Sequence, residues 1–196
     1  KYVNQVGPYA VVGLQNSIER VSYLPRETDT DLESGLSHEP LTTDHGIPGP
    51  HAACRFDGGT GAGSITMLAY ASIVGPYMTD GVSVTPLARG LDWKRIVKTS
   101  QLETSVFVCY PRERWLVLYY NPYGSSHTRN TRALIFHYQP DKIKQGGDFP
   151  VTGPIKVSGR SACEAVVNGS SYLLTGHENS GYVYQEDYGV TSPVTY

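Results

Sequence analysis

The chain has 196 residues, with 16 Lys and Arg against 18 Asp and Glu and a net charge of −2. This near-neutral balance gives no electrostatic reason to expect nucleic acid or an anionic membrane as the main partner. The 21 Gly, 13 Pro and 15 Tyr are typical of short strands joined by turns. No run of about 20 apolar residues occurs, so the sequence predicts no span across a bilayer.

The N-terminal region contains two short apolar runs followed by a long polar stretch. Residues 10–14 and 17–23 indicate strands at the end of a unit whose start is missing. Residues 26–50 do not have the pattern of a strand unit, and we expect a loop that projects toward a neighbouring subunit. Within it, the carboxylates of residues 29–33 lack the glycine and terminal glutamate of a calcium-binding loop, which favours a solvated acidic loop.

Three cysteines mark a loose repeat along the rest of the chain. Cys54, Cys109 and Cys163 are spaced 55 and 54 residues apart, and each opens a segment of short apolar or tyrosine-rich runs. A period of about 40 to 55 residues with several strands in each repeat is typical of β-propellers. The odd count and wide spacing argue against a disulfide framework, so we expect the cysteines to be small buried hydrophobic residues.

The runs expected to form strands within the repeats are 53–56, 64–70, 75–84, 106–110, 115–120, 133–138, 162–167, 171–176 and 181–187. Residues 58–64 are rich in glycine but lack the Lys-Ser or Lys-Thr ending of a P-loop, which favours a flexible hairpin loop. Asn168 and Gly169 suit a type I′ turn, and this explains the Asn-Gly-Ser triplet without glycosylation. Residues 92–101 are the best candidate for one short helix.

The sequence contains no pattern that predicts catalysis or metal binding. His45 and His51 bracket a segment rich in Gly and Pro, and no HExxH or comparable ligand pair is present. A Gly-x-Ser-x-Gly elbow and the Asp-box of sialidase propellers are also missing. We therefore expect no catalytic residues, no metal, no cofactor and no enzymatic activity. A dispersed carboxylate pair in the central funnel of a propeller remains open as a catalytic alternative.

Aromatic residues next to a polar loop suggest a different class of function, sugar binding. Tyr119, Tyr120 and Tyr123 lie beside Asn121 and a serine-rich segment. Exposed aromatic rings stack on sugars, so these four residues are the candidate binding residues of an extracellular carbohydrate-binding propeller. We expect most other tyrosines to pack in the core or between sheets.

Several degenerate motifs resemble one family of known proteins. They are the string at 13–23, the Gly-x-Tyr-x-x-Asp-Gly unit at 75–81, the paired runs at 115–120 and 133–138, and the closing unit at 174–184. In these motifs the sequence is similar to β-propeller virion proteins of tailed bacteriophages, such as tail nozzle, tail tubular and adaptor or hub proteins. The likeness spans most of the chain, and it carries over no individual functional residue.

The resemblance implies an all-β fold, a β-propeller-like array of short antiparallel blades that forms part of a larger ring. We expect a single domain or fragment with blade-like units at about 1–50, 51–105, 106–158 and 159–196. The implied function is that of a structural virion component, located in the extracellular particle and contributing to assembly, DNA passage or host contact. Its expected partners are other copies of itself, neighbouring virion proteins and a host surface glycan or receptor, with DNA only as cargo in a channel.

Overall fold

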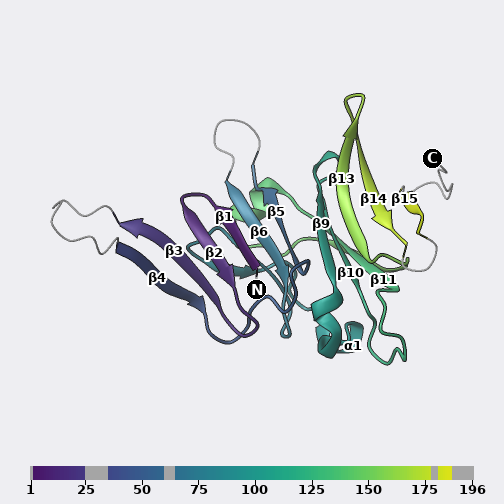
Figure 1. The fold of residues 1–196 in the computed structure, drawn as a ribbon, viewed down its shortest axis with the longest axis horizontal. Coiled ribbons are helices and arrows are strands. Elements are labelled where there is room, and N and C mark those ends of the chain that lie inside the picture. Colours follow the sequence, from purple (N-terminus) through teal and green to yellow (C-terminus); the bar gives the residue numbers. More distant parts are fainter. Residues whose placement is uncertain (1, 25–34, 60–64, 178–180, 187–196) are drawn as a thin grey trace.

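The computed structural model describes residues 2–24, 35–59, 65–177 and 181–186. Within these ranges the chain forms four antiparallel sheets, each built from strands that are consecutive in the sequence (Figure 1). The expectation of an all-β fold is therefore confirmed. None of the described helices is long and apolar enough to cross a membrane.

The four sheets are numbered here in chain order. Sheet 1 contains β1 (Tyr2–Val6), β2 (Tyr9–Gly13), β3 (Ile18–Leu24) and β4 (Gly35–Thr42). Sheet 2 contains β5 (Ala53–Asp57), β6 (Thr66–Ala71), β7 (Pro76–Thr79) and β8 (Val84–Pro86). Sheet 3 contains β9 (Val106–Tyr110), β10 (Trp115–Tyr120), β11 (Arg132–His137) and β12 (Val151–Lys156). Sheet 4 contains β13 (Ser161–Val167), β14 (Ser170–Gly176) and β15 (Val183–Glu186).

Short helical turns connect these elements. Between sheets 2 and 3 the chain forms α1 (Trp93–Ile96) and the 3₁₀ helix η1 (Thr99–Thr104). A second 3₁₀ helix, η2 (Pro111–Glu113), joins β9 to β10, and α2 (Pro140–Lys144) follows β11. The single helix expected at residues 92–101 is thus replaced by two shorter ones, because the chain leaves helical geometry at Val97 and Lys98.

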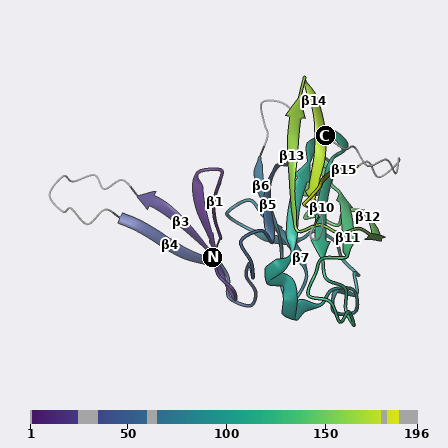
Figure 2. The same cartoon turned by 45° about the vertical axis from the view of Figure 1, so that its right-hand side comes forward.

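The sheets are stacked in a row, and their first strands lie side by side. β1 contacts β5 and β6, β5 contacts β9, and β9 contacts β13. Sheets 1 and 4 lie at opposite ends of the row in Figure 1, and in Figure 2 β3 and β4 of sheet 1 again lie on the side away from sheet 4, which overlaps sheet 3 in that view. The row is therefore an open array whose two middle sheets are each packed between neighbours.

Alternation along β6 shows how sheet 2 packs on both neighbours. Leu68 and Tyr70 belong to the core shared with sheet 1, whereas Met67 and Ala69 belong to the core shared with sheet 3. All four side chains are buried. A strand buried on both faces has a nearly continuous apolar sequence rather than an alternating one, which explains the run from Met67 to Ala71.

Sheet 3 is built in the same way around β10. Leu116, Leu118 and Tyr120 pack toward sheet 2, and Val117 and Tyr119 pack toward sheet 4. The register pairs β10 with both β9 and β11 along its length, so no backbone edge of this strand is open. β10 is thus the most completely enclosed strand of sheet 3.

One expectation for the N-terminal region is wrong, and one strand there was not expected. Residues 2–6 form β1, ahead of the two runs expected to be strands, and sheet 1 is a four-stranded sheet. Part of the stretch 26–50 forms β4 rather than a loop, and it pairs with β3 along most of its length. The acidic segment at 29–33 lies outside the described residues. The sequence pattern did not predict β4, because this edge strand contains polar residues and Pro40, and edge strands tolerate both.

Candidate functional site

A cavity of about 450 Å³ lies where the first strands of sheets 2, 3 and 4 converge. We call it the first-strand cavity. Cys54 and Asp57 of β5, Cys109 of β9 and Glu164 of β13 contribute polar or ionisable side chains to its lining. Phe56, Phe107 and Tyr138 supply aromatic surface. An apolar wall with a few convergent polar groups is the usual composition of a ligand site.

Cys54 and Cys109 line the same cavity because each lies on the face of its strand that turns toward the core between sheets 2 and 3. Cys54 pairs with Ala69 across β5 and β6, and Cys109 pairs with Leu116 across β9 and β10. Ala69 and Leu116 both belong to the core between sheets 2 and 3, and both thiols pack against that core. Cys163 is exposed and lies on the opposite face of sheet 4 from the cavity, so the expectation that all three cysteines are buried is wrong for Cys163.

Burial keeps both cavity thiols protonated at neutral pH. It raises the pKa of Cys54 well above its ordinary value, and the neighbouring Cys109 raises it further. Burial is also the main cause that raises the pKa of Cys109 to about 12, although a hydrogen bond with Tyr138 opposes the shift. Because the thiolate is the nucleophilic and metal-binding form, this environment does not activate either cysteine.

Two carboxylates stand at the rim of the cavity. Asp57 and Glu164 both line it, and both residues are exposed. The hydroxyl of Ser171 donates a hydrogen bond to Glu164 Oε1. The acid of a glycosidase pair is usually held in an apolar environment, whereas Asp57 and Glu164 are both exposed. The fold thus brings two exposed carboxylates to the rim of one cavity.

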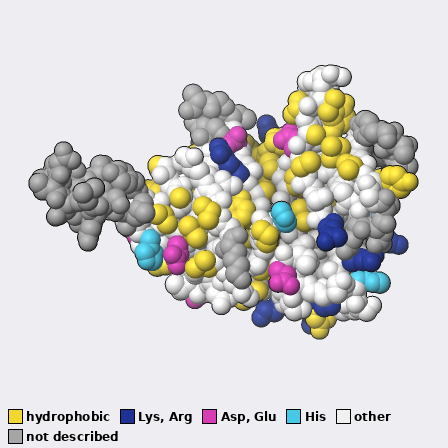
Figure 3. All heavy atoms as spheres, viewed as in Figure 1, with side chains coloured by type: hydrophobic (Ala, Val, Ile, Leu, Met, Phe, Trp, Pro, Cys, Tyr) yellow, Lys and Arg dark blue, Asp and Glu magenta, His cyan; other side chains and the backbone are white. Residues whose placement is uncertain are grey.

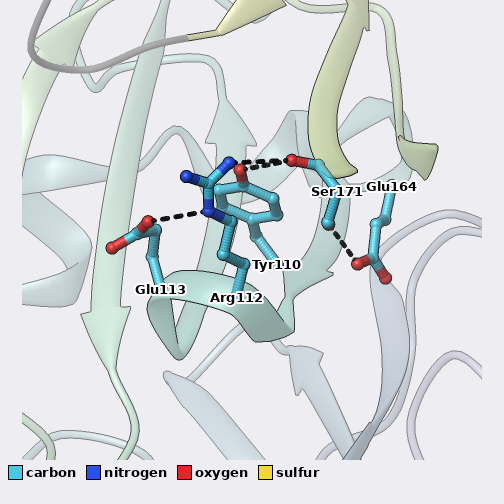
Figure 4. A network of polar contacts seen from close by, with 5 residues as sticks. All are labelled: Tyr110, Arg112, Glu113, Glu164 and Ser171. Atoms are coloured by element: carbon cyan, nitrogen blue, oxygen red, sulfur yellow. Dashed lines mark hydrogen bonds and ion pairs between the residues drawn. The ribbon is translucent and has the colours of Figure 1, made fainter. Parts of the chain in front are cut away.

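A polar network fixes the wall of the cavity formed by sheets 3 and 4 (Figure 4). The hydroxyl of Tyr110 donates to the backbone oxygen of Ser171 at 3.0 Å, and Arg112 Nη1 donates to the same oxygen at 3.4 Å. The Arg112 guanidinium also pairs with Glu113, with 3.5 Å between Nε and Oε1. Through Ser171 the network continues to Glu164. It therefore connects the end of β9 and η2 to the β13–β14 hairpin.

The candidate sugar-binding residues do not form one exposed platform. Tyr119 and Tyr120 are 0% and 1% exposed, because both faces of β10 are covered. Asn121 is 2% exposed, and its amide nitrogen donates to Gln101 Oε1 and to the His127 backbone oxygen. Tyr123 differs from the other three, since 66% of its surface is exposed. Of the four candidates, only Tyr123 has a ring placed to stack on a ligand.

One other sequence prediction has an outcome in the structure. Asn168 and Gly169 have φ values of 52° and 78°, and they join β13 to β14 as the type I′ turn requires, so this prediction is confirmed. Residues 60–64 of the glycine-rich segment lie outside the described residues. Over the part of the chain that is described, no three His, Cys, Asp or Glu side chains are placed to hold one metal ion.

Sequence reasoning missed the first-strand cavity as a site. Asp57 and Glu164 belong to sheets 2 and 4, and Tyr138 follows the last residue of β11. Nothing in their sequence spacing indicates that they meet. The cysteine repeat was the available signal, because it marks the first strands of sheets 2, 3 and 4. It did not reveal which faces of those strands turn toward each other.

Comparison with known proteins found no match for the chain, either among protein-family models or among curated proteins.

Proposed function

We propose that the chain is an arc of a β-propeller and that its role is structural. The observation that supports this most is the order of the strands. Each sheet is an antiparallel meander of consecutive strands, and the first strands lie side by side along the row. Radial repetition of four-stranded sheets around a central axis is the design of propellers. The first strands β1, β5, β9 and β13 would then line the axis.

The burial pattern favours a scaffold over a flexible binding module. Sheets 2 and 3 are buried on both faces, and their largest buried side chains include Tyr70, Tyr119 and Phe136. Each such side chain contributes about 1.5–3 kcal/mol by leaving water. A rigid array of this kind holds its surface loops at fixed positions. The cavity thiols are protonated and its two carboxylates are exposed, which also favours a structural role over catalysis.

The proposed setting is a virion, in which the chain contributes to a phage tail as part of a nozzle, tube or adaptor. This part of the proposal rests on the sequence motifs that resemble propeller proteins of tailed phages. The proposed partners are other copies of the chain, neighbouring virion proteins and a host surface glycan or receptor. DNA would pass only as cargo through the channel of the assembly.

Particle association tests the proposal. Particles purified from the native source by density-gradient centrifugation are analysed by quantitative mass spectrometry for peptides of this chain. We expect the peptides to co-sediment with the particles at a fixed ratio to the other structural proteins. Recovery of the chain only in the particle-free fractions would overturn the virion role.

A further inference from the structure

One row of side chains crosses three neighbouring strands of sheet 3. Tyr120 of β10 lies directly opposite Arg132 of β11, and Arg132 lies directly opposite Lys156 of β12. Residues that are directly opposite in antiparallel strands point to the same face, with about 5 Å between their Cβ atoms. The phenol, the guanidinium and the ammonium group are therefore neighbours on one face of the sheet. We call these three residues the basic row.

The basic row leads from the interior of the protein to solvent. Tyr120 is 1% exposed, Arg132 is half-buried and Lys156 is exposed. The order of the strands explains this gradient, because β12 is an outer edge of sheet 3 and β10 lies within the sheet. In Figure 3, Lys and Arg side chains gather on the lower right of the visible face, where β10 and β11 lie in Figure 1. The row is therefore open to a small ligand at its β12 end.

Arg132 and Lys156 place two positive charges next to each other. Like charges that are directly opposite on neighbouring strands destabilise a sheet. No carboxylate in the described part of the chain forms an ion pair with either residue. The Arg132 guanidinium donates instead, through Nη1, to the backbone oxygen of the adjacent Thr131 at 3.1 Å. The described residues thus leave both positive charges without a negative partner.

The hydroxyl of Tyr120 adds a hydrogen-bond donor that has no acceptor. Its oxygen is buried and has no hydrogen-bond partner among the described residues. Burial raises the pKa of Tyr120 to about 12, and the charge of Arg132 opposes the shift. The phenol is therefore protonated at neutral pH and lies within reach of the guanidinium charge. Because a buried polar group without a partner costs free energy, its position beside two cations points to an acceptor that the described chain does not supply.

An oxyanion complements the three groups of the basic row, because it supplies both negative charge and several acceptor oxygens. A guanidinium binds two oxygens of one phosphate or carboxylate group side by side, and an ammonium group adds a point charge. A phenol donates one further hydrogen bond. A phosphate dianion balances the charges of Arg132 and Lys156, whereas a carboxylate balances only one of them. The chemistry of the row therefore favours phosphate.

We propose that the basic row binds a phosphate group, in which Arg132 and Lys156 bind the anion and Tyr120 donates a hydrogen bond to one of its oxygens. On binding, the guanidinium exchanges the Thr131 oxygen for the phosphate, and the Tyr120 hydroxyl gains the acceptor that it lacks. The ligand is free phosphate or a phosphomonoester, which share this group. The site goes beyond the proposed structural role and does not depend on the propeller arrangement.

Calorimetric titration of the purified chain with inorganic phosphate tests the site. The ionic strength is held constant with chloride, because salt screens non-specific attraction between exposed charges. We expect saturable binding of one phosphate per chain, with a Kd in the millimolar range or lower. Acetate should bind at least about tenfold more weakly, because it carries one charge fewer and offers fewer oxygens. Equal affinity for acetate and phosphate would overturn the assignment to phosphate.

Substitution of either cation in the basic row should weaken phosphate binding. Lys156→Gln removes one charge at an exposed position of an edge strand, and Arg132→Lys keeps the charge but removes the planar pair of donors. Each variant should raise the Kd for phosphate at least about tenfold. Lys94→Gln is the matched control, because Lys94 is exposed on α1, and loss of its charge should change the Kd by less than about twofold.

Tyr120→Phe tests whether the phenol donates to the anion. In phosphate-free buffer this variant should unfold at the same urea concentration as the native chain or at a higher one, because the hydroxyl has no partner among the described residues. In the phosphate titration its Kd should rise about tenfold or more, as expected for loss of a hydrogen bond to a charged group. A Kd equal to that of the native chain would contradict the role assigned to Tyr120.

Glycerol 3-phosphate identifies the form in which the phosphate group is bound. If the site accepts a phosphomonoester, glycerol 3-phosphate should bind at least as tightly as inorganic phosphate, and Arg132→Lys should weaken both. Binding of inorganic phosphate alone would support the site and restrict its ligand to the free ion.

A native chain that shows no saturable binding of either compound would overturn the inference. Equal losses of affinity in Lys94→Gln and Lys156→Gln would also overturn it, because they would indicate general electrostatic attraction. Circular dichroism of each variant should match that of the native chain, which excludes unfolding as the cause of weaker binding. A chain that co-sediments with particles but binds no phosphate would refute this site and leave the proposed structural role intact.

Discussion

The imidazole of His45 stacks on the ring of Tyr77, with 4.3 Å between the ring centroids. His45 follows sheet 1 in the chain and Tyr77 belongs to sheet 2, so this contact helps to hold the first two sheets together. His45 Nε2 lies 3.3 Å from the Tyr70 hydroxyl, and Nδ1 lies 3.3 Å from Thr42 Oγ1. The imidazole is thus packed among an aromatic ring and two hydroxyl groups.

This environment predicts a loss of stability in acid. Burial lowers the pKa of His45 below its ordinary 6.5, although Asp44 opposes the shift. The unfolded chain therefore binds a proton at higher pH than the folded chain does. The stability from neutral His45 is fully present above about pH 6.5 and declines as the pH falls below it. Urea unfolding at several pH values should show a steeper decline for the native chain than for His45→Gln.

The control for this experiment is His51→Gln, because the side chain of His51 is exposed. This variant should follow the native pH dependence. If the free energy of unfolding fell equally with pH in the native chain and in His45→Gln, protonation of His45 would not be coupled to the packing of sheets 1 and 2.

Close backbone approach at Gly49 predicts a large cost for any side chain there. Gly49 lies in the linker between sheets 1 and 2, and a Cβ atom on it would sit 2.1 Å from the Glu103 backbone oxygen. Gly49→Ala should therefore reduce the free energy of unfolding by about 3 kcal/mol or more. Gly90→Ala has open space but a φ of +72°, so it should cost only about 1–2 kcal/mol. Equal urea midpoints for the two variants would contradict this packing.

Removal of the Tyr120 hydroxyl should not reduce the stability of the folded chain. This oxygen is buried and has no hydrogen-bond partner among the described residues, and burial raises the pKa of Tyr120 to about 12. An unpaired buried polar group costs about 1–3 kcal/mol. Tyr120→Phe should therefore be neutral or more stable than the native chain by about 1 kcal/mol in thermal or urea unfolding. A clear loss of stability would mean that the hydroxyl has a partner.

Removal of the Tyr110 hydroxyl, in contrast, should reduce the stability of the folded chain. Its hydroxyl donates to the Ser171 backbone oxygen at 3.0 Å and links sheet 3 to sheet 4 (Figure 4). Tyr110→Phe should cost about 1 kcal/mol, the usual net value of one hydrogen bond. Hydrogen exchange should show the loss as faster exchange of amides in β13 and β14. Unchanged exchange there would indicate that the bond does not hold the two sheets together.

The cavity thiols should resist modification in the folded chain. In a Cys163→Ser background only Cys54 and Cys109 remain, and with a pKa of about 12 the thiolate fraction of Cys109 at pH 8 is about 10⁻⁴. N-ethylmaleimide labelling followed by mass spectrometry should be slow for both residues and become rapid in urea. Rapid labelling under native conditions would contradict the protonated, half-buried state of these thiols.

Substitution of the exposed Tyr123 distinguishes the structural role from sugar binding. Tyr123→Ala should change the free energy of unfolding by less than about 0.5 kcal/mol, whereas Tyr119→Ala should cost about 3–5 kcal/mol. A glycan array should show no sugar preference if the role is purely structural. A preferred sugar whose binding is lost in Tyr123→Ala would support the carbohydrate-binding alternative.

Strands with strong apolar character could be predicted from the sequence. The run 115–120 coincides with β10, and 162–167 and 171–176 differ from β13 and β14 by one residue at the start. β4 and β12 were missed, because both are edge strands that include a proline and alternate weakly. Apolar composition predicts buried strands well, whereas edge strands are stabilised by pairing that the local sequence does not reveal.

The candidate site was less predictable than the strands. Tyr119, Tyr120 and Tyr123 lie within five residues of one another, yet only Tyr123 is exposed, because β10 is covered by sheets on both faces and Tyr123 lies beyond its end. The position of Cys54 and Cys109 in one cavity depends on which face of each first strand meets the next sheet. A shift of one residue in register would reverse that face.

Electron imaging of the protein in its native source tests the central claim most directly. We predict multi-subunit rings within a larger particle, in which the sheets are arranged radially and β1, β5, β9 and β13 lie nearest the axis. A homogeneous monomer in which sheets 1 and 4 keep their outer faces in solvent would contradict both the propeller arrangement and the structural role.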